Sequence, residues 1–327
     1  MKLASRCQGR DGQLIVVSDD GHRYLDATVI APTLQSALDQ WTHVVSSLEA
    51  LARQLADDPT CGHPLDIKEC AAPLPRAFHW VDGSAYVNHV ELVRKARGAA
   101  LPRSFWTDPL VYQGGSDDFL GPYEPARFAS EDWGIDLEAE IAVVVGDVPM
   151  GSTAEAIRDR GDIKFVMLVN DWSLRHLIPQ ELEKGFGFYQ SKPATAFGPF
   201  AVTPESLGKV WDGGKLHLAV CSFINDQCLG SPWAQDDMVF DFPQLIAHCA
   251  KTRNLRAGSI IGSGTVSNRD RSRGVSCLAE KRALEIIDHG TPHTPFLKFG
   301  DRVRIEVLTI TGQSVFGAID QLVAPID

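Results

Sequence analysis

An apolar run that begins with acids stands near the middle of the chain: Asp136-Leu-Glu138-Ala-Glu140-Ile-Ala-Val-Val-Val-Gly146. It predicts a strand over residues 137–145. Successive side chains of a strand alternate between its faces, so Glu138 and Glu140 share one face, about 7 Å apart. Two acids are costly to bury there unless a cation neutralises them. The pattern fits either a divalent metal bridging both acids or an exposed sheet edge.

Similar short runs dominate the chain from Phe78 onward, separated by turns rich in Gly, Pro and Asp. Strands are expected at residues 137–145, 165–170, 200–203, 216–224, 283–287 and 303–309. Helices are fewer and are expected at residues 87–97, 154–160, 173–184 and 242–251. This order is typical of a strand-rich α+β fold and lacks the regular alternation of a βαβ series.

The start of the chain is predicted to be a smaller unit. The runs at residues 14–17 and 23–26 flank a Ser-Asp-Asp-Gly turn, which predicts a hairpin. Residues 33–56 carry apolar side chains at helical spacing and predict one long or two short helices. We therefore expect a small N-terminal α/β domain at residues 1–72 and a catalytic domain at residues 73–327.

Composition narrows the class of protein. The 327 residues include 44% hydrophobic residues, which is ordinary globular composition. Asp and Glu number 42 against 31 Lys and Arg, a net charge of -11 without a basic cluster, so nucleic-acid binding is not expected. No apolar run approaches the roughly 18 residues of a membrane span. The odd number of cysteines, 7, argues against a disulfide framework. We expect a cytoplasmic protein with no membrane or nucleic-acid partner.

Acids also follow other strand-like segments. The run at residues 165–170 leads into Asp171-Trp-Ser-Leu-Arg175. Asp171 is either the N-cap of a helix or a further carboxylate ligand, in which case Arg175 on the next turn faces an anion. The segment Trp80-Val-Asp82 adds an acid, and His89 follows seven residues later, although a lone histidine is more often structural.

Two further segments hold small residues. Gly258-Ser-Ile-Ile-Gly262-Ser-Gly264-Thr265 lets backbone N–H groups approach an oxyanion, and Glu280 follows fifteen residues after Thr265. Ser191-Lys192-Pro-Ala-Thr195 holds a lysine whose ordinary place is the surface. Each signal is weak alone. Acids on several separate segments nevertheless indicate a hard-cation site with oxygen ligands.

Together these motifs resemble the fumarylacetoacetate hydrolase family over about residues 78–325. The resemblance is strongest at Leu137-Glu138-Ala-Glu140, Asn170-Asp171-Trp172-Ser173-x-Arg175 and Gly262-Ser-Gly264-Thr265, in that order. It implies a catalytic domain built as a mixed β-sandwich roll. It also implies a homodimer and, as in some members, a smaller N-terminal domain.

The resemblance further implies the members of the site. The divalent cation, Mg²⁺ or Ca²⁺ and sometimes Mn²⁺, would bind the carboxylates of Asp82, Glu138, Glu140 and Asp171. His89 would activate water, Glu280 would orient that histidine, and Lys192 would lie near metal and substrate. The implied substrate-binding residues are Tyr112, Arg175, Gln180 and Thr265.

Two positions depart from fumarylacetoacetase itself. A tyrosine two residues after the first metal aspartate is replaced by Ser84, and Tyr86 is displaced by two. A glutamine seven residues after the Asn-Asp-Trp aspartate is replaced by Ile178, and Gln180 is displaced by two. Both departures concern substrate contacts and leave the metal ligands in place.

The leading hypothesis is hydrolysis of a carbon–carbon bond in a β-diketo acid, fumarylacetoacetate or a related acylpyruvate, in aromatic-compound catabolism. The alternatives are a decarboxylase, an isomerase or a sugar-acid dehydratase on the same scaffold, and a metal-binding protein without activity. The substrate is expected to be a small anion. Since the net charge of -11 repels anions at long range, Arg175, Lys192 and the metal must attract it locally.

Overall fold

The computed structural model describes residues 1–96, 98 and 100–326. Its strands are β1 (Lys2–Arg6), β2 (Gln13–Val17), β3 (Arg23–Asp26), β4 (His63–Pro64), β5 (Trp80–Gly83), β6 (Val111–Gln113), β7 (Ala126–Phe128), β8 (Ile135–Asp136), β9 (Ala139–Val145), β10 (Ile163–Asn170), β11 (Ser173–Leu174), β12 (Ala196–Phe197), β13 (Ala201–Val202), β14 (Val220–Ile224), β15 (Gln227–Gly230), β16 (Ile260–Gly262), β17 (Arg302–Val307) and β18 (Ile319–Pro325).

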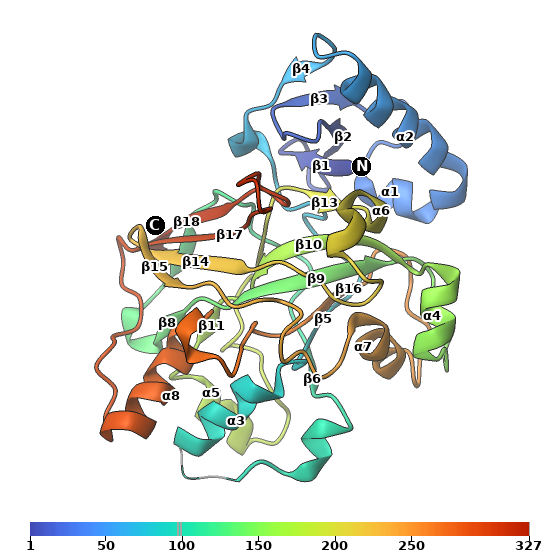
Figure 1. Ribbon diagram of the computed structural model, residues 1–327. Coiled ribbons are helices and arrows are strands. Elements are labelled where there is room, and N and C mark those ends of the chain that lie inside the picture. Colours follow the sequence, from blue (N-terminus) through green and yellow to red (C-terminus); the bar gives the residue numbers. More distant parts are fainter. Residues whose placement is uncertain (97, 99, 327) are drawn as a thin grey trace.

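The helices lie mostly at the periphery (Figure 1). They are α1 (Leu34–Asp39), α2 (Trp41–Asp57), α3 (Val87–Ala96), α4 (Ala154–Arg160), α5 (Ile178–Glu183), α6 (Pro204–Leu207), α7 (Phe242–Cys249) and α8 (Leu278–His289). Short 3₁₀ helices lie at Ile67–Glu69, Arg103–Trp106, Glu131–Trp133, Gly208–Val210 and Arg271–Arg273. The strand-rich α+β class expected from the sequence is confirmed.

One mixed sheet runs through the molecule in the order β4-β3-β2-β1-β13-β10-β9-β16-β5-β6, with β12 also beside β10. Its described neighbours are antiparallel except β16 and β5, which run parallel. A second sheet has the order β15-β14-β17-β18-β7. It packs on the first, since β14 contacts β9, and β17 and β18 contact β10. The two sheets thus form a sandwich with helices around it (Figure 1).

Both faces of β9 are covered, which explains its unbroken apolar sequence. Ile141, Val143 and Val145 lie in a core shared with the second sheet. Ala142 and Val144 point the other way, into a core shared with the helices near the N-terminus. The expected edge strand is therefore excluded, and the acids that begin this strand are buried with it.

The N-terminal strands continue the main sheet. The expected hairpin is present as β2 and β3, and the predicted helical stretch is divided into α1 and α2. A strand that the sequence reading missed, β1, pairs Leu3 with Ala201 of β13 and so joins this region to the rest. The boundary between residues 72 and 73 stays a prediction, because the sheet crosses from one region to the other.

Several predicted elements differ from those observed. The strand expected at residues 283–287 is wrong, because this stretch belongs to α8, which begins at the cap Cys277 and ends at Gly290 in a left-handed conformation. The helix expected from residue 173 begins only at Ile178, beside a proline that favours a first turn. The strand expected at residues 216–224 begins at Val220.

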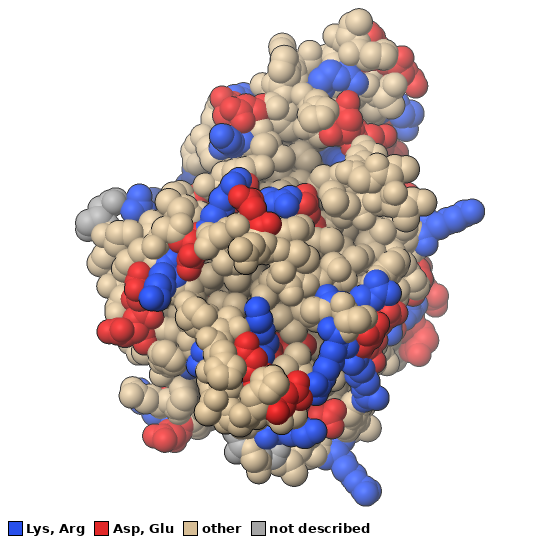
Figure 2. All heavy atoms as spheres, turned by 60° about the vertical axis from the view of Figure 1, so that its left-hand side comes forward, with Lys and Arg blue, Asp and Glu red and all other residues tan. Residues whose placement is uncertain are grey.

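Helices 154–160 and 242–251 are present as α4 and α7, the second ending at Cys249. The helix expected at residues 87–97 is present as α3, and Arg97 lies outside the described residues. Acidic and basic side chains alternate over the face shown in Figure 2 and leave no large patch of one sign there. Among the described residues, no helix combines the length and apolarity needed to cross a bilayer.

Candidate active site

Three carboxylates from different strands meet beside the middle of the main sheet. Asp82 lies in β5, Glu140 is the second residue of β9, and Asp171 directly follows β10. The pairing of Glu140 with Val169 brings the last two together, and β16 links β9 to β5. One oxygen from each carboxylate lies within 4.8 Å of the others, and all three residues are buried. We call Asp82, Glu140 and Asp171 the carboxylate cluster.

The donors of this cluster fit a divalent cation. Both carboxylate oxygens of Glu140 are buried without a hydrogen-bond partner among the described residues. Burial, reinforced by the charge of Asp171, raises the pKa of Asp82 to about 8. Burial and the charge of Asp82 likewise raise the pKa of Glu140 well above its ordinary value. The charge of Lys192 opposes both shifts without cancelling them, and hard cations are bound by this kind of oxygen ligand.

Glu138 has different surroundings. One of its oxygens, Oε1, accepts a hydrogen bond of 2.5 Å from Ser173 Oγ and one of 2.9 Å from Lys192 Nζ. Arg175 Nη2 lies 2.9 Å from the same oxygen, and the Thr265 hydroxyl donates to Oε2. Burial opposes ionisation, but the Arg175 and Lys192 charges outweigh it and hold the pKa of Glu138 below its ordinary value. Glu138 lies outside the close carboxylate cluster.

Lys192 connects Glu138 with the cluster, and Tyr112 and Thr195 donate hydrogen bonds to the cluster. Lys192 Nζ lies 2.6 Å from Asp171 Oδ2, and the Tyr112 hydroxyl donates to that same oxygen at 2.5 Å. Thr195 Oγ1 donates to the other oxygen, Oδ1, at 2.8 Å. Burial opposes the charge of Lys192, but Asp171 and Glu138 raise its pKa above the ordinary value, so it stays protonated. The surface position considered for this lysine is therefore wrong.

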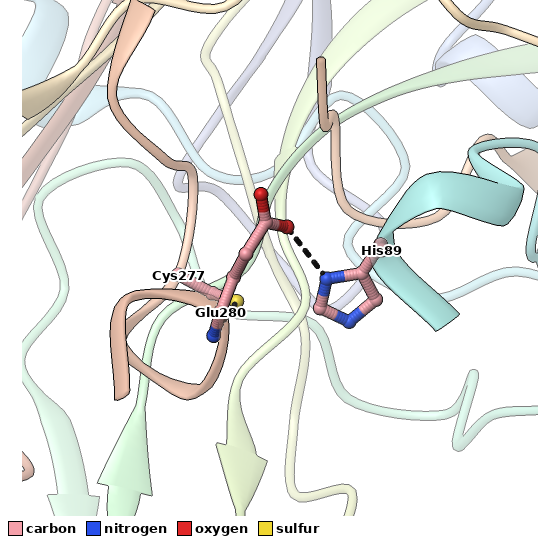
Figure 3. A group of neighbouring side chains, drawn as sticks. All are labelled: His89, Cys277 and Glu280. Carbon is pink, nitrogen blue, oxygen red and sulfur yellow. Dashed lines mark hydrogen bonds and ion pairs between the residues drawn. The ribbon is translucent and has the colours of Figure 1, made fainter. Parts of the chain in front are cut away.

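His89 and Glu280 form a second group, the dyad. His89 Nδ1 lies 2.8 Å from Glu280 Oε2, and the other ring nitrogen points away from the carboxylate (Figure 3). The histidine lies in the first turn of α3 and Glu280 in the first turn of α8. The Glu280 side chain is 1% exposed and that of His89 16%, so the histidine is partly exposed and its partner is buried. Cys277 Sγ accepts a hydrogen bond from the Glu280 N–H.

Two positioning acids were missed by the sequence reading. Asp136 accepts hydrogen bonds from the backbone N–H groups of Leu278 and Ala279 and from Arg175 Nε, at 2.7, 2.9 and 2.8 Å. It therefore connects the start of α8 with Arg175. Burial raises the pKa of Asp136, although Arg175 opposes this effect. Its local sequence offered no signal, because its partners lie far along the chain.

The second missed acid is Glu181. Its carboxylate accepts hydrogen bonds from the backbone N–H groups of Tyr189, Gln190 and Ser191, and from the Ser191 hydroxyl. These bonds close the turn that leads into Lys192. Hydrogen bonding outweighs burial and lowers the pKa of Glu181.

Most of the residues predicted for the site lie in one connected network. Glu138, Lys192 and Arg175 join through ion pairs, and the 265–267 segment reaches both Glu138 and the dyad. Gln180 lies apart: it is exposed on α5 and makes no hydrogen bond to this network within the part of the chain that the structure describes.

Comparison with known families agrees with this geometry. The family model for the fumarylacetoacetate hydrolase C-terminal domain matches residues 79–324, and that for the fumarylacetoacetase N-terminal domain 2 matches residues 1–76. The chain belongs to the fumarylacetoacetate hydrolase family. The resemblance drawn from the motifs is confirmed.

Individual relatives of this family member are distant. Fumarylacetoacetase of Arabidopsis thaliana is 26% identical over 259 residues, covering 70% of this chain and 56% of the relative. The chain thus spans little more than half of that relative. An oxaloacetate tautomerase of Bacillus subtilis (strain 168) is 27% identical over 241 residues, covering 72% and 68%.

A solved structure shares the fold. Maleylpyruvate hydrolase from Sphingobium sp. SYK-6, in complex with manganese(II) ion and pyruvate, aligns over 100% of both chains with a TM-score of 0.67 and 16% identity.

Proposed function

We propose that this protein is a divalent-metal-dependent hydrolase that cleaves a carbon–carbon bond in a β-diketo acid, such as fumarylacetoacetate or an acylpyruvate. The observation that carries the proposal is the His89–Glu280 dyad, which is joined to the acidic site by a three-residue segment. Water needs a base before it can attack a carbonyl, and a carboxylate-oriented histidine supplies one. Aromatic-compound catabolism in the cytoplasm is the proposed setting.

The metal is proposed to be Mg²⁺, Ca²⁺ or Mn²⁺, held by Asp82, Glu140 and Asp171, with Glu138 as the expected fourth ligand. Such an ion would supply Lewis-acid polarisation of the substrate carbonyls. Support comes from the unpartnered oxygens of Glu140 and from the closeness of the three carboxylates.

The protein's own residues carry the proton transfers. Glu280 favours the His89 tautomer protonated at Nδ1, which leaves Nε2 free to accept a proton from water. The resulting hydroxide adds to one carbonyl, and the carbon–carbon bond breaks with its electron pair on the departing carbon. The protonated His89 then returns the proton to that carbon, so one water yields a carboxylic acid and a ketone. The positive charge of Lys192 would stabilise the developing oxyanion.

A tautomerase is the second candidate, favoured by the Bacillus subtilis relative. There the same dyad would move a proton between carbon and oxygen of an oxo acid and leave every carbon–carbon bond intact. Decarboxylation, other isomerisations and dehydration of sugar acids also need proton transfer without attack by water.

The test is a screen of Mg²⁺-dependent absorbance loss with fumarylacetoacetate, fumarylpyruvate, acetylpyruvate and oxaloacetate, with products identified by mass. His89→Ala should lower kcat roughly 10²- to 10⁴-fold. His217→Ala is the matched control, because His217 forms the same kind of pair with Asp212, at 2.8 Å, on the surface. Unchanged cleavage by metal-loaded His89→Ala contradicts the water-activating role, and keto–enol conversion without cleavage selects the tautomerase.

The proposed assembly is a homodimer, and the proposed substrate is a small anion. Light scattering coupled to size-exclusion chromatography tests the assembly: a 35.7 kDa species at working concentration would contradict it.

A further inference from the structure

We propose that Ser267 and Asn88 are positioning residues that fix the Glu280 carboxylate against His89. The inference rests on the proposed role of His89 and deepens it.

A continuous chain of hydrogen bonds carries the proposal. Asn88 Nδ2 donates to Ser267 Oγ at 2.7 Å, and Ser267 Oγ donates to Glu280 Oε1 at 2.9 Å. The other carboxylate oxygen, Oε2, is the one that faces His89 Nδ1 at 2.8 Å. Glu280 is thus held through both oxygens, and rotation about its terminal bond breaks at least one contact. The serine thereby fixes the orientation of the carboxylate plane that faces the histidine.

The direction of these bonds follows from their chemistry. An amide NH₂ group only donates, so Asn88 occupies a lone pair of the Ser267 oxygen. The serine hydroxyl hydrogen is then free for the carboxylate, which only accepts when ionised. Asn88 therefore orients Ser267, and Ser267 orients Glu280.

Burial makes each link matter. Ser267 is 0% exposed, Glu280 1% and Asn88 7%. A buried carboxylate that loses a donor is left with an unsatisfied acceptor oxygen, because few water molecules can replace the lost donor. Within the described residues Glu280 has one side-chain donor on each oxygen. Removal of Ser267 Oγ therefore frees the carboxylate to turn.

A cavity of about 340 Å³ lies beside Asn88 and Glu280. Its wall includes Asn88 and Leu92 of α3, and Glu280 and Leu284 of α8. The Asn88 side chain, which donates to Ser267, forms part of this wall. Shortening it would open a route for water to the Ser267–Glu280 bond.

The chain also couples the two halves of the site. Thr265 donates to Glu138, and Ser267, two residues later, donates to Glu280. Asn88 and His89 are neighbours in α3. One short segment and one helical turn thus set the dyad relative to the acids.

The first test reads the histidine itself and needs no turnover. In protein labelled with ¹⁵N-histidine and loaded with Mg²⁺, the His89 signals are assigned by their loss in His89→Ala. Wild type should show the Nδ1–H tautomer, and Ser267→Ala and Asn88→Ala should both lower its population. Ser222→Ala is the matched control, since this buried serine of β14 has an unpartnered hydroxyl. An unchanged His89 tautomer in folded Ser267→Ala overturns the proposal.

The second test is a double-mutant cycle on the activity. Ser267→Ala should lower kcat roughly 10-fold, the size expected for one hydrogen bond to a charged group, with KM within about twofold. In a Glu280→Ala background the same change should cost nothing further, because the carboxylate that accepts from Ser267 is gone. Equal losses in both backgrounds indicate a merely structural role and overturn the proposal. If wild type turns over no substrate, the proposed function fails, and the tautomer measurement still decides this inference.

Discussion

Glu138 and Glu140 stand two residues apart at the start of one strand and have opposite electrostatic surroundings. Glu138 is contacted by Lys192, Arg175 and two hydroxyl groups, and its pKa is lowered. Within the part of the chain that the structure describes, both oxygens of Glu140 lack a hydrogen-bond partner, and its pKa is raised. The difference indicates which acid depends on a bound cation and which is already neutralised by protein. Glu138 holds the side chains of Lys192 and Arg175, and Glu140 is the acid whose proposed ligand role depends most on a bound metal.

The largest effect on stability is expected from Glu138→Gln. It leaves the Lys192 and Arg175 charges with less compensation, and breaking a buried ion pair costs about 3 kcal/mol or more. Urea unfolding with and without Mg²⁺ measures this. Asp11→Asn, in an exposed ion pair with Arg76, is the control and should cost less than about 1 kcal/mol. A Glu138→Gln protein that is more stable than wild type would contradict the contrast drawn between Glu138 and Glu140.

Glu140→Gln should have the reverse signature. It removes a metal ligand, so metal affinity and turnover should both fall roughly 100-fold or more. The metal-free protein should be at least as stable as wild type, because a costly buried acid is gone. Calorimetric titration with Mn²⁺ measures the metal affinity, and urea unfolding in chelator measures the stability of the metal-free protein. Retained affinity would show that Glu140 is not a ligand.

The pH dependence of the metal-free protein comes next in size. The pKa of Asp82 rises from an ordinary 3.8 to about 8 on folding. This group therefore stabilises the fold fully below about pH 4, and its contribution is lost as pH rises through about 8. In chelator the melting temperature should fall by a few degrees between pH 6 and 9. Mg²⁺ binds the ionised form, so it should reduce the fall of the melting temperature with pH. An equal fall with and without Mg²⁺ would contradict this prediction.

The smallest effect is expected from Gln180→Ala. The side chain is exposed on α5, apart from the charged network. The family resemblance implies that Gln180 contacts the substrate, whereas its exposed position on α5 implies that it does not. Measurement of kcat/KM decides between these two expectations. We expect a change within about twofold, as for most surface substitutions. A tenfold loss would show that α5 reaches the substrate.

The sequence could predict those site residues that lie beside a recognisable local pattern, and it could not predict those that are identified only by distant contacts. Asp82, Glu140 and Asp171 lie beside strands with clear apolar patterns, so their convergence could be anticipated. The contacts of Asp136 and Ser267 could not, because their hydrogen-bond partners lie more than a dozen residues away in the chain. No local pattern records such pairings.

The fold shows the same limit. The apolar run of β9 could be predicted as a strand because both faces of this strand are buried, which makes the run continuous. In contrast, the stretch at residues 283–287 was predicted as a strand because a few apolar residues carry no reliable period. The signals that identify the helix are at its two ends, the N-cap Cys277 and the left-handed Gly290. The apolar run between them does not identify it.

The pairing of Lys2 and Leu3 with Val202 and Ala201 has a consequence for the order of events during synthesis. About 200 residues must follow β1 before its partner β13 exists. At roughly 5–20 residues per second this takes about 10–40 s. Throughout that interval one edge of β1 has no partner strand, and an open strand edge is exposed to wrong pairing and to chaperones.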